Sequence, residues 1–234
     1  MSSMNDYLKS FSPNPEATQI IIMLPDIWSQ TSYSADTATQ FAEKFGMPVY
    51  MLDYFYQLTG KANNFNPQTD QAIAPELMAK MTGEDFIAIF NKALEDIKQN
   101  QPKLEFIIVI GFCFGGRLAY LSGLSSEVKK IVAFYGAGAH TANYYEGKTP
   151  VEALCEIRRN DQSLSILSFY GSKDGSIPEA DRLTTAQALK DAGINYTEKI
   201  YDAGHAYFQP GRADMYNEAA ASASWADLQN FIRQ

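Results

Sequence analysis

The residues best suited to chemistry lie in the segment Gly111-Phe112-Cys113-Phe114-Gly115, which follows a β-branched run at residues 107–110. A strand, a Gly-x-Cys-x-Gly turn and a helix, in that order, are typical of a nucleophile elbow. The glycines permit a sharp turn whose central residue has a strained backbone. The dipole of the following helix favours ionisation of a thiol at this position. Cys113 is therefore a candidate nucleophile, and the alternative is a half-buried structural cysteine in a glycine-rich turn.

A cysteine nucleophile needs a base within hydrogen-bond reach, and the sequence contains only two histidines. His205 follows a strand-like stretch at residues 195–201, directly after a glycine that permits a tight turn. His140 lies in a glycine-rich stretch inside a long connection, and we interpret it as an exposed loop residue. His205 is therefore the candidate base, although it too could be an ordinary loop imidazole.

The base in turn needs an acid that orients it. Asp174 comes shortly after a predicted strand at residues 164–170, between Cys113 and His205 in the chain. This order of nucleophile, acid and histidine is that of α/β-hydrolases. The other acids nearby are Asp161, Asp181, Asp191 and Asp202. Three of these are better explained as caps or solvated charges, and Asp202 lies too close to His205 on the same turn.

The elements that position these residues alternate between strands and helices. We expect strands at residues 19–24, 49–52, 104–110, 130–135, 164–170 and 195–201. We expect helices at residues 35–45, 82–97, 114–123, 176–192 and 214–232, and a further short helix that begins at residue 149. This alternation predicts an α/β domain with a mainly parallel central sheet flanked by helices. Such sheets bind ligands beyond the carboxyl ends of their strands, where every candidate above is expected to lie.

The domain organisation follows from the same pattern. Residues 1–18 are polar and interrupted by proline, so we expect an irregular N-terminal extension before a single domain at residues 19–234. The connection at residues 53–81 is long and rich in Tyr, Asn and Gln. Loops of this length are usually functional lids or disordered segments.

Composition and charge exclude several classes of function. Lys and Arg number 19 against 27 Asp and Glu, and the resulting net charge of −8 argues against nucleic acid and anionic membranes as partners. No apolar run is long enough to span a bilayer, and the N-terminus lacks the pattern of a signal peptide. The two cysteines, Cys113 and Cys155, suggest neither a disulfide framework nor a metal site. We therefore expect a cytoplasmic protein without a bound metal.

The chain resembles the dienelactone hydrolase family from about Gln19 onward. Four stretches carry the resemblance: Leu24-Pro25-Asp26-Ile27-Trp28, Gly111-Phe112-Cys113-Phe114-Gly115-Gly116, Tyr170-Gly171-Ser172-Lys173-Asp174 and Gly204-His205-Ala206-Tyr207-Phe208. The resemblance implies an α/β-hydrolase fold and cleavage of lactones or related esters without a cofactor. It implies Cys113 as nucleophile, His205 as base and then acid, and Asp174 as its orienting group. The backbone N–H groups of Ile27 and Phe114 would form the oxyanion hole.

The chain departs from the family pattern at two places near the predicted site. Asp26 stands where the family has a glutamate that accepts the thiol hydrogen bond, so we expect Asp26 to modulate the nucleophile from a shorter side chain. The archetypal member holds its substrate carboxylate with arginines, one of them a few residues after the histidine, where this chain reads Ala206-Tyr207-Phe208-Gln209. An aromatic, less charged pocket is the expected alternative, formed by Trp28, Tyr54, Tyr56 and Tyr207.

These observations predict a hydrolase of the dienelactone hydrolase type. It would cleave a small-molecule lactone or carboxylic ester through a thioester acyl-enzyme, as a monomer or homodimer. One alternative is a non-catalytic module of the same fold that binds a small ligand and leaves Cys113 idle. Another is a thiol sensor, because an exposed, ionised cysteine can be oxidised, although no resolving cysteine lies nearby in sequence.

Overall fold

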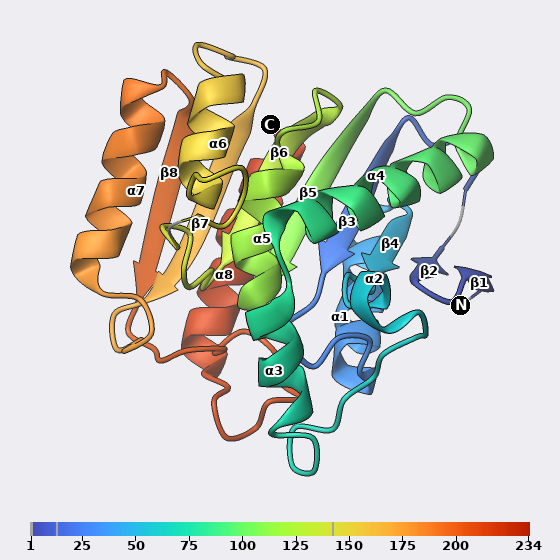
Figure 1. Ribbon diagram of the computed structural model, residues 1–234, viewed down its shortest axis with the longest axis horizontal. Coiled ribbons are helices and arrows are strands. Elements are labelled where there is room, and N and C mark those ends of the chain that lie inside the picture. Colours follow the sequence, from blue (N-terminus) through green and yellow to red (C-terminus); the bar gives the residue numbers. More distant parts are fainter. Residues whose placement is uncertain (1, 13, 142) are drawn as a thin grey trace.

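The computed structural model describes residues 2–12, 14–141 and 143–234. Its strands form one eight-stranded sheet in the order β1-β2-β4-β3-β5-β6-β7-β8 (Figure 1). The strands are β1 (Ser2–Asn5), β2 (Leu8–Phe11), β3 (Gln19–Leu24), β4 (Val49–Leu52), β5 (Phe106–Phe112), β6 (Val128–Phe134), β7 (Ser165–Gly171) and β8 (Asn195–Tyr201). The pairs from β4 to β8 are parallel, and β1 and β2 are antiparallel. The predicted mainly parallel sheet is confirmed.

Helices cover both faces of this sheet (Figure 1). They are α1 (Ser32–Phe45), α2 (Tyr56–Thr59), α3 (Ile73–Lys80), α4 (Gly83–Asn100), α5 (Phe114–Ser122), α6 (Pro150–Ile157), α7 (Glu179–Asp191) and α8 (Glu218–Arg233). Apolar residues of α4, α5 and α6 share one core cluster, and those of α1 and α8 share the other. The sheet therefore separates two cores, one on each face.

The central strands are buried on both faces, as their sequence predicts. All six residues of β5 after Phe106 are buried, and β3 is equally buried after its first residue. A strand that is covered by helices on both sides needs no polar face, which explains the uninterrupted isoleucine runs. β8 lies at the edge of the sheet, and its residues are exposed or half-buried.

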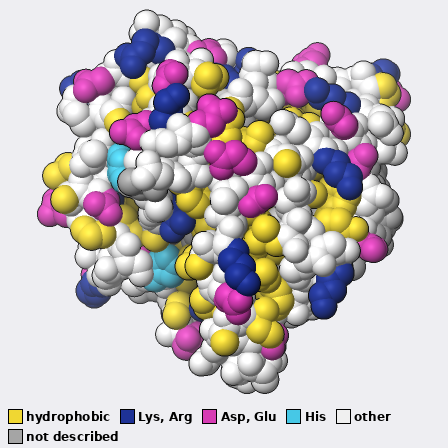
Figure 2. Space-filling model, viewed as in Figure 1, with side chains coloured by type: hydrophobic (Ala, Val, Ile, Leu, Met, Phe, Trp, Pro, Cys, Tyr) yellow, Lys and Arg dark blue, Asp and Glu magenta, His cyan; other side chains and the backbone are white. Residues whose placement is uncertain are grey.

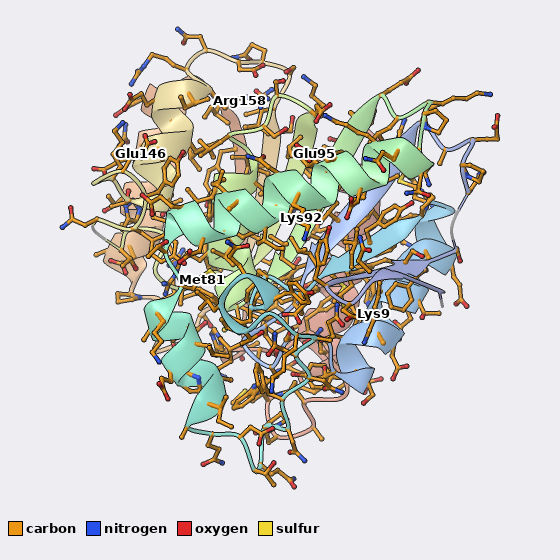
Figure 3. All side chains as sticks on the ribbon, turned by 45° about the vertical axis from the view of Figure 1, so that its right-hand side comes forward. Lys9, Met81, Lys92, Glu95, Glu146 and Arg158 are labelled. Carbon is orange, nitrogen blue, oxygen red and sulfur yellow. The ribbon has the colours of Figure 1, made fainter. Side chains whose placement is uncertain are left out.

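Capping residues explain where several helices begin. Thr82 and Thr149 each form a capping box with an acidic residue three positions later, which confirms the two predicted starts. The predicted start of a helix at residue 176 is wrong, because the Ser176 N–H donates to Asp174 Oδ1 (2.9 Å) and α7 begins only after Pro178. Helix α4 then crosses one face of the sheet, and Lys92 and Glu95 project from it in Figure 3.

The N-terminal residues are not the irregular extension that the sequence suggested. β2 pairs antiparallel with β4, and β1 pairs with β2, so these residues extend the sheet. Tyr7 and Leu8 are buried in the core cluster that also contains α4. Two four-residue strands are too short for a clear period-2 pattern, which is why their sequence did not reveal them.

The long connection at residues 53–81 is ordered rather than structureless. It contains α2 and α3, and Phe55 is fully buried against Phe65 and Phe114. Its action as a lid stays a prediction. Within the described ranges, no helix combines the length and apolar character needed to cross a membrane.

Candidate active site

Cys113 lies in a strained turn between β5 and α5. Its backbone angles are φ 53° and ψ −113°, and residues other than glycine rarely adopt a positive φ of this kind. The flanking glycines are required by close backbone contacts: a Cβ at Gly111 would lie 2.1 Å from the carbonyl oxygen of Gly115, and a Cβ at Gly115 would lie 2.3 Å from that of Leu24. This is the geometry of a nucleophile elbow.

The structure brings Cys113, His205 and Asp174 together in one hydrogen-bonded chain. His205 Nε2 lies 3.1 Å from Cys113 Sγ, and His205 Nδ1 lies 2.7 Å from Asp174 Oδ2. The three residues follow β5, β8 and β7, whose carboxyl ends meet at one edge of the sheet (Figure 1). The Asp174 side chain is fully buried and that of His205 is 23% exposed, so solvent reaches the imidazole but not the carboxylate.

The surroundings of His205 favour its protonated form. Burial alone would lower the pKa of this imidazole, but the hydrogen bonds to Asp174 and Cys113 outweigh burial and raise the pKa to about 10. The ring also packs edge-on against Tyr135, with 5.2 Å between ring centroids. An imidazolium held this way stabilises a neighbouring thiolate, which is the reactive form of cysteine.

Two backbone amides are the predicted donors of an oxyanion hole. Phe114 is the first residue of α5, where a helix leaves N–H groups without an internal acceptor. Ile27 follows β3 in the neighbouring loop, and neither amide has a hydrogen-bond partner among the residues that the structure describes. Their action as an oxyanion hole stays a prediction.

Asp26 is buried next to the site and bonds to groups other than the thiol. Its Oδ2 forms an ion pair with Arg212 Nη1 (3.0 Å), and its Oδ1 accepts from the Trp28 N–H (3.0 Å) and the Tyr33 hydroxyl (3.0 Å). Burial raises the pKa of Asp26, against the opposing charge of Arg212. Within the described chain, no hydrogen bond joins Asp26 to Cys113, so direct modulation of the thiol stays a prediction.

The predicted aromatic pocket is only partly present. Trp28 lines a cavity of about 890 Å³, together with Tyr33 and Arg212. Tyr54 and Tyr207 are fully buried, which contradicts their expected contact with substrate. The Tyr54 hydroxyl donates to the carbonyl oxygens of Pro25 (2.9 Å) and Asp26 (2.7 Å), and that of Tyr207 pairs with a serine of α8.

The remaining predicted residues lie away from the thiol. The ring of Tyr56 packs against that of Tyr7, with 5.3 Å between centroids. His140 is half-buried rather than exposed, and its Nε2 lies 2.7 Å from the Thr185 hydroxyl. Cys155 is buried and belongs to the core cluster that contains α6.

Arg117 was not predicted from the sequence and lies one helical turn after Cys113. Its guanidinium packs over the rings of Phe114 and Tyr144, and its Nε donates to the Ala137 carbonyl oxygen (2.8 Å). In the part of the chain that the structure describes, no carboxylate pairs with it. The i, i+4 spacing from Cys113 was the available signal.

Tyr135 was also missed, although it directly follows β6 at the same edge of the sheet. Its backbone has φ 40° and its ring lies against His205. The rule that ligands bind beyond strand ends would have identified it. Among the described residues, no group of three His, Cys, Asp or Glu side chains could hold a metal ion.

A strained cysteine elbow beside a histidine and an aspartate, at the carboxyl edge of a mainly parallel sheet, defines an α/β-hydrolase. The sequence model described as "Dienelactone hydrolase family" matches residues 8–234, so the chain belongs to this family. It is a hydrolase of carboxylic esters or lactones.

Relatives and solved structures agree with this assignment. A "Putative carboxymethylenebutenolidase" of Salmonella typhimurium is 25% identical over 99% of this chain and 84% of its own length. A protein of the same name from Synechocystis is 26% identical over 92% of this chain and 85% of its own. The crystal structure of a "Putative Dienelactone Hydrolase" from Klebsiella pneumoniae has a TM-score of 0.75 at 22% identity, covering 95% of this chain and 90% of that one. This last similarity concerns the fold alone.

Proposed function

We propose that Cys113, His205 and Asp174 hydrolyse a lactone or carboxylic ester through a thioester acyl-enzyme. The observation that carries this proposal is the continuous path from thiol to imidazole to carboxylate, with steps of 3.1 Å and 2.7 Å. The path begins on an elbow residue whose strained backbone is maintained by close glycine contacts. Strain of this kind persists at sites where it serves function.

In the first half-reaction the Cys113 thiolate attacks the carbonyl carbon of the substrate. The new C–S bond forms while the carbonyl π electrons move to oxygen. The resulting oxyanion accepts hydrogen bonds from the Phe114 and Ile27 amides, each worth about 3 kcal/mol in comparable sites. The His205 imidazolium then donates its Nε2 proton to the leaving alkoxide as the C–O bond breaks.

In the second half-reaction a water molecule replaces the alcohol. His205, now neutral, takes a proton from water at Nε2, and the hydroxide attacks the thioester carbonyl. The C–S bond then breaks, which releases the carboxylic acid and regenerates the Cys113 thiolate beside the His205 imidazolium. Asp174 keeps the ring in the tautomer that presents Nε2 to the substrate throughout.

The proposal extends to the substrate, the oligomeric state and the cellular location. The names of the curated relatives make butenolide lactones the first compounds to test. Trp28 and the cavity beside it would accept a small substrate. We further propose a single catalytic domain that works as a monomer or homodimer in the cytoplasm, where Cys113 stays reduced.

The test is hydrolysis of p-nitrophenyl acetate and a panel of enol lactones by the wild type, Cys113→Ala and Cys155→Ala. We expect Cys113→Ala to lose activity by about 10³-fold or more with its circular dichroism unchanged. Cys155→Ala is the matched control, because it removes a buried thiol far from the elbow, and it should keep wild-type rates. Mass spectrometry of the quenched wild-type reaction should detect an acyl group on Cys113.

Two outcomes would contradict the proposal. Activity that survives in Cys113→Ala would exclude a thioester mechanism. A wild type that turns over no ester or lactone would instead favour the non-catalytic module, or a thiol sensor if peroxide oxidises Cys113 at low concentration.

A further inference from the structure

Asp53 is a buried carboxylate that takes no part in the mechanism proposed above. It directly follows β4, and its side chain has no exposed surface. Within the described ranges it forms no ion pair with Lys, Arg or His, and its partners are neutral hydrogen-bond donors. Carboxylates buried without a cation are rare, because their desolvation is costly. Such a group calls for an explanation.

Besides the backbone N–H of Phe55, the donors around Asp53 come from two segments distant in the chain. One is the oxyanion loop, which we define as Pro25–Ser29 because it carries the Ile27 amide. The Ser29 hydroxyl donates to Asp53 Oδ1 (2.9 Å). The other segment follows α2: the Asn63 N–H and side-chain amide both donate to Asp53 Oδ2, at 2.6 Å and 3.0 Å. Asp53 thus ties the oxyanion loop to the segment that passes over it.

Further contacts show that this part of the loop is held closely. Trp28 accepts a backbone hydrogen bond from Phe65 (3.0 Å), and Gln30 donates one to Asn63 (3.3 Å). Ser29 itself has φ 61°, a conformation that a residue with a Cβ adopts only when its surroundings impose it. Ser29, Asn63 and Asp53 are all buried, so water does not compete for these hydrogen bonds.

We propose that Asp53 is a positioning residue for the oxyanion hole and acts through Ser29 on the Ile27 amide two residues away. This inference rests on the proposed function, because it assumes that an oxyanion forms beside Ile27. A carboxylate suits the task because it only accepts hydrogen bonds, and every neighbouring group that it meets is a donor. The strained Ser29 backbone would relax without this anchor and carry the amide with it.

The ionisation of Asp53 supports a role beyond stability. Burial raises the pKa of Asp53 from 3.8 to about 6, against the opposing effect of its hydrogen bonds. A carboxyl whose pKa is higher in the folded state makes folding less favourable as the pH rises through that interval. At neutral pH the charged side chain therefore reduces stability, as is common for residues that serve an active site.

The test separates oxyanion binding from thiol reactivity with two reagents. p-Nitrophenyl acetate acylates Cys113 and requires a tetrahedral oxyanion. Iodoacetamide alkylates the same thiol by displacing iodide from carbon, with no oxyanion formed. We expect Ser29→Ala to slow acylation, measured as the pre-steady-state burst, by about 10- to 100-fold, because small displacements of catalytic groups cost this much. Alkylation of Cys113, followed by mass spectrometry, should keep its wild-type rate.

A matched control is Ser122→Ala, which removes another buried serine hydroxyl, bonded to Ala119 in α5. It should leave both rates unchanged. If the Asp53→Ala variant folds, it should also be acylated more slowly and alkylated at the wild-type rate. If Asp53→Ala does not fold, the result with Ser29→Ala tests the inference. Equal loss of acylation and alkylation in Ser29→Ala, or loss of neither, would overturn the inference. Failure of the proposed function is distinguishable, because then either the wild type would not be acylated at all or Cys113→Ala would still be acylated.

Discussion

His205 lies between two groups that both favour its protonated form. Asp174 binds Nδ1 and Cys113 binds Nε2, and these hydrogen bonds raise the pKa of the imidazole above its ordinary value of 6.5 despite burial. The proposed mechanism needs the His205 imidazolium as a proton donor, so activity should persist well above pH 6.5 and decline on the alkaline side as His205 deprotonates. The same sign holds for stability: the contribution of the His205 hydrogen bonds is present below pH 6.5 and disappears as the pH rises toward 10.

Substitution of Asp174 tests this assignment. We expect Asp174→Asn to lower the pKa of His205, move the alkaline limb of kcat/KM to lower pH and reduce kcat by about 10³-fold or more, because the wrong tautomer becomes favoured. Asp202→Asn is the control, since it neutralises an exposed carboxylate nearby that pairs with Lys173. A pH profile of Asp174→Asn that coincides with the wild type would contradict the role of Asp174.

At the scale of elements, the elbow depends on how closely α5 approaches β3. A Cβ at Gly115 would lie 2.3 Å from the Leu24 carbonyl oxygen and 2.4 Å from that of Pro25, where β3 leads into the oxyanion loop. We expect Gly115→Ala to destabilise the fold by about 1–3 kcal/mol, as overpacking does, and to lower kcat more than it raises KM. Urea unfolding and steady-state kinetics measure the two effects.

A second glycine separates crowding from backbone effects. Gly46 ends α1 with φ 65° and has open space around it, so Gly46→Ala introduces strain without a clash. It should lose about 1 kcal/mol of stability and keep its kcat. If Gly115→Ala retains wild-type kcat, the close approach of α5 to β3 is not needed for catalysis.

The elements could be predicted where a local signal determines them. β3, β4 and β8 have the expected bounds, because turn residues delimit apolar or alternating runs. α8 begins at Glu218, later than expected, because Asn217 supplies the cap and the preceding residues form the loop that contains Arg212. The ion pair between Asp26 and Arg212 joins residues 186 positions apart, and no local pattern predicts such a partner.

The candidate site shows the same division. Cys113, Asp174 and His205 could be identified because each follows a strand and the chain order restricts the choice. The burial of Tyr54 could not, because an aromatic residue after a strand suits either a pocket or a core. Its hydroxyl finds acceptors only once β3 and β4 are adjacent.

At the scale of the whole molecule, the two signs of charge are mixed on the face that Figure 2 shows. Figure 2 shows acidic and basic side chains interspersed on one face, although the chain carries a net charge of −8. One sheet runs from the N-terminal strands to β8 and separates the two cores (Figure 1).

The N-terminal strands should therefore contribute to global stability, unlike an irregular extension. Leu8 has no exposed surface and packs in the core cluster beneath α4, so we expect Leu8→Ala to lower the free energy of unfolding by about 2–5 kcal/mol. Lys9, half-buried on the same strand, is the matched control, and Lys9→Ala should change the free energy of unfolding by about 0.5 kcal/mol or less. A single urea transition that moves to lower denaturant in Leu8→Ala alone would place these strands in the cooperative core. An unchanged midpoint would mean that the core folds without them, because a side chain buried in a common core cannot be truncated without cost.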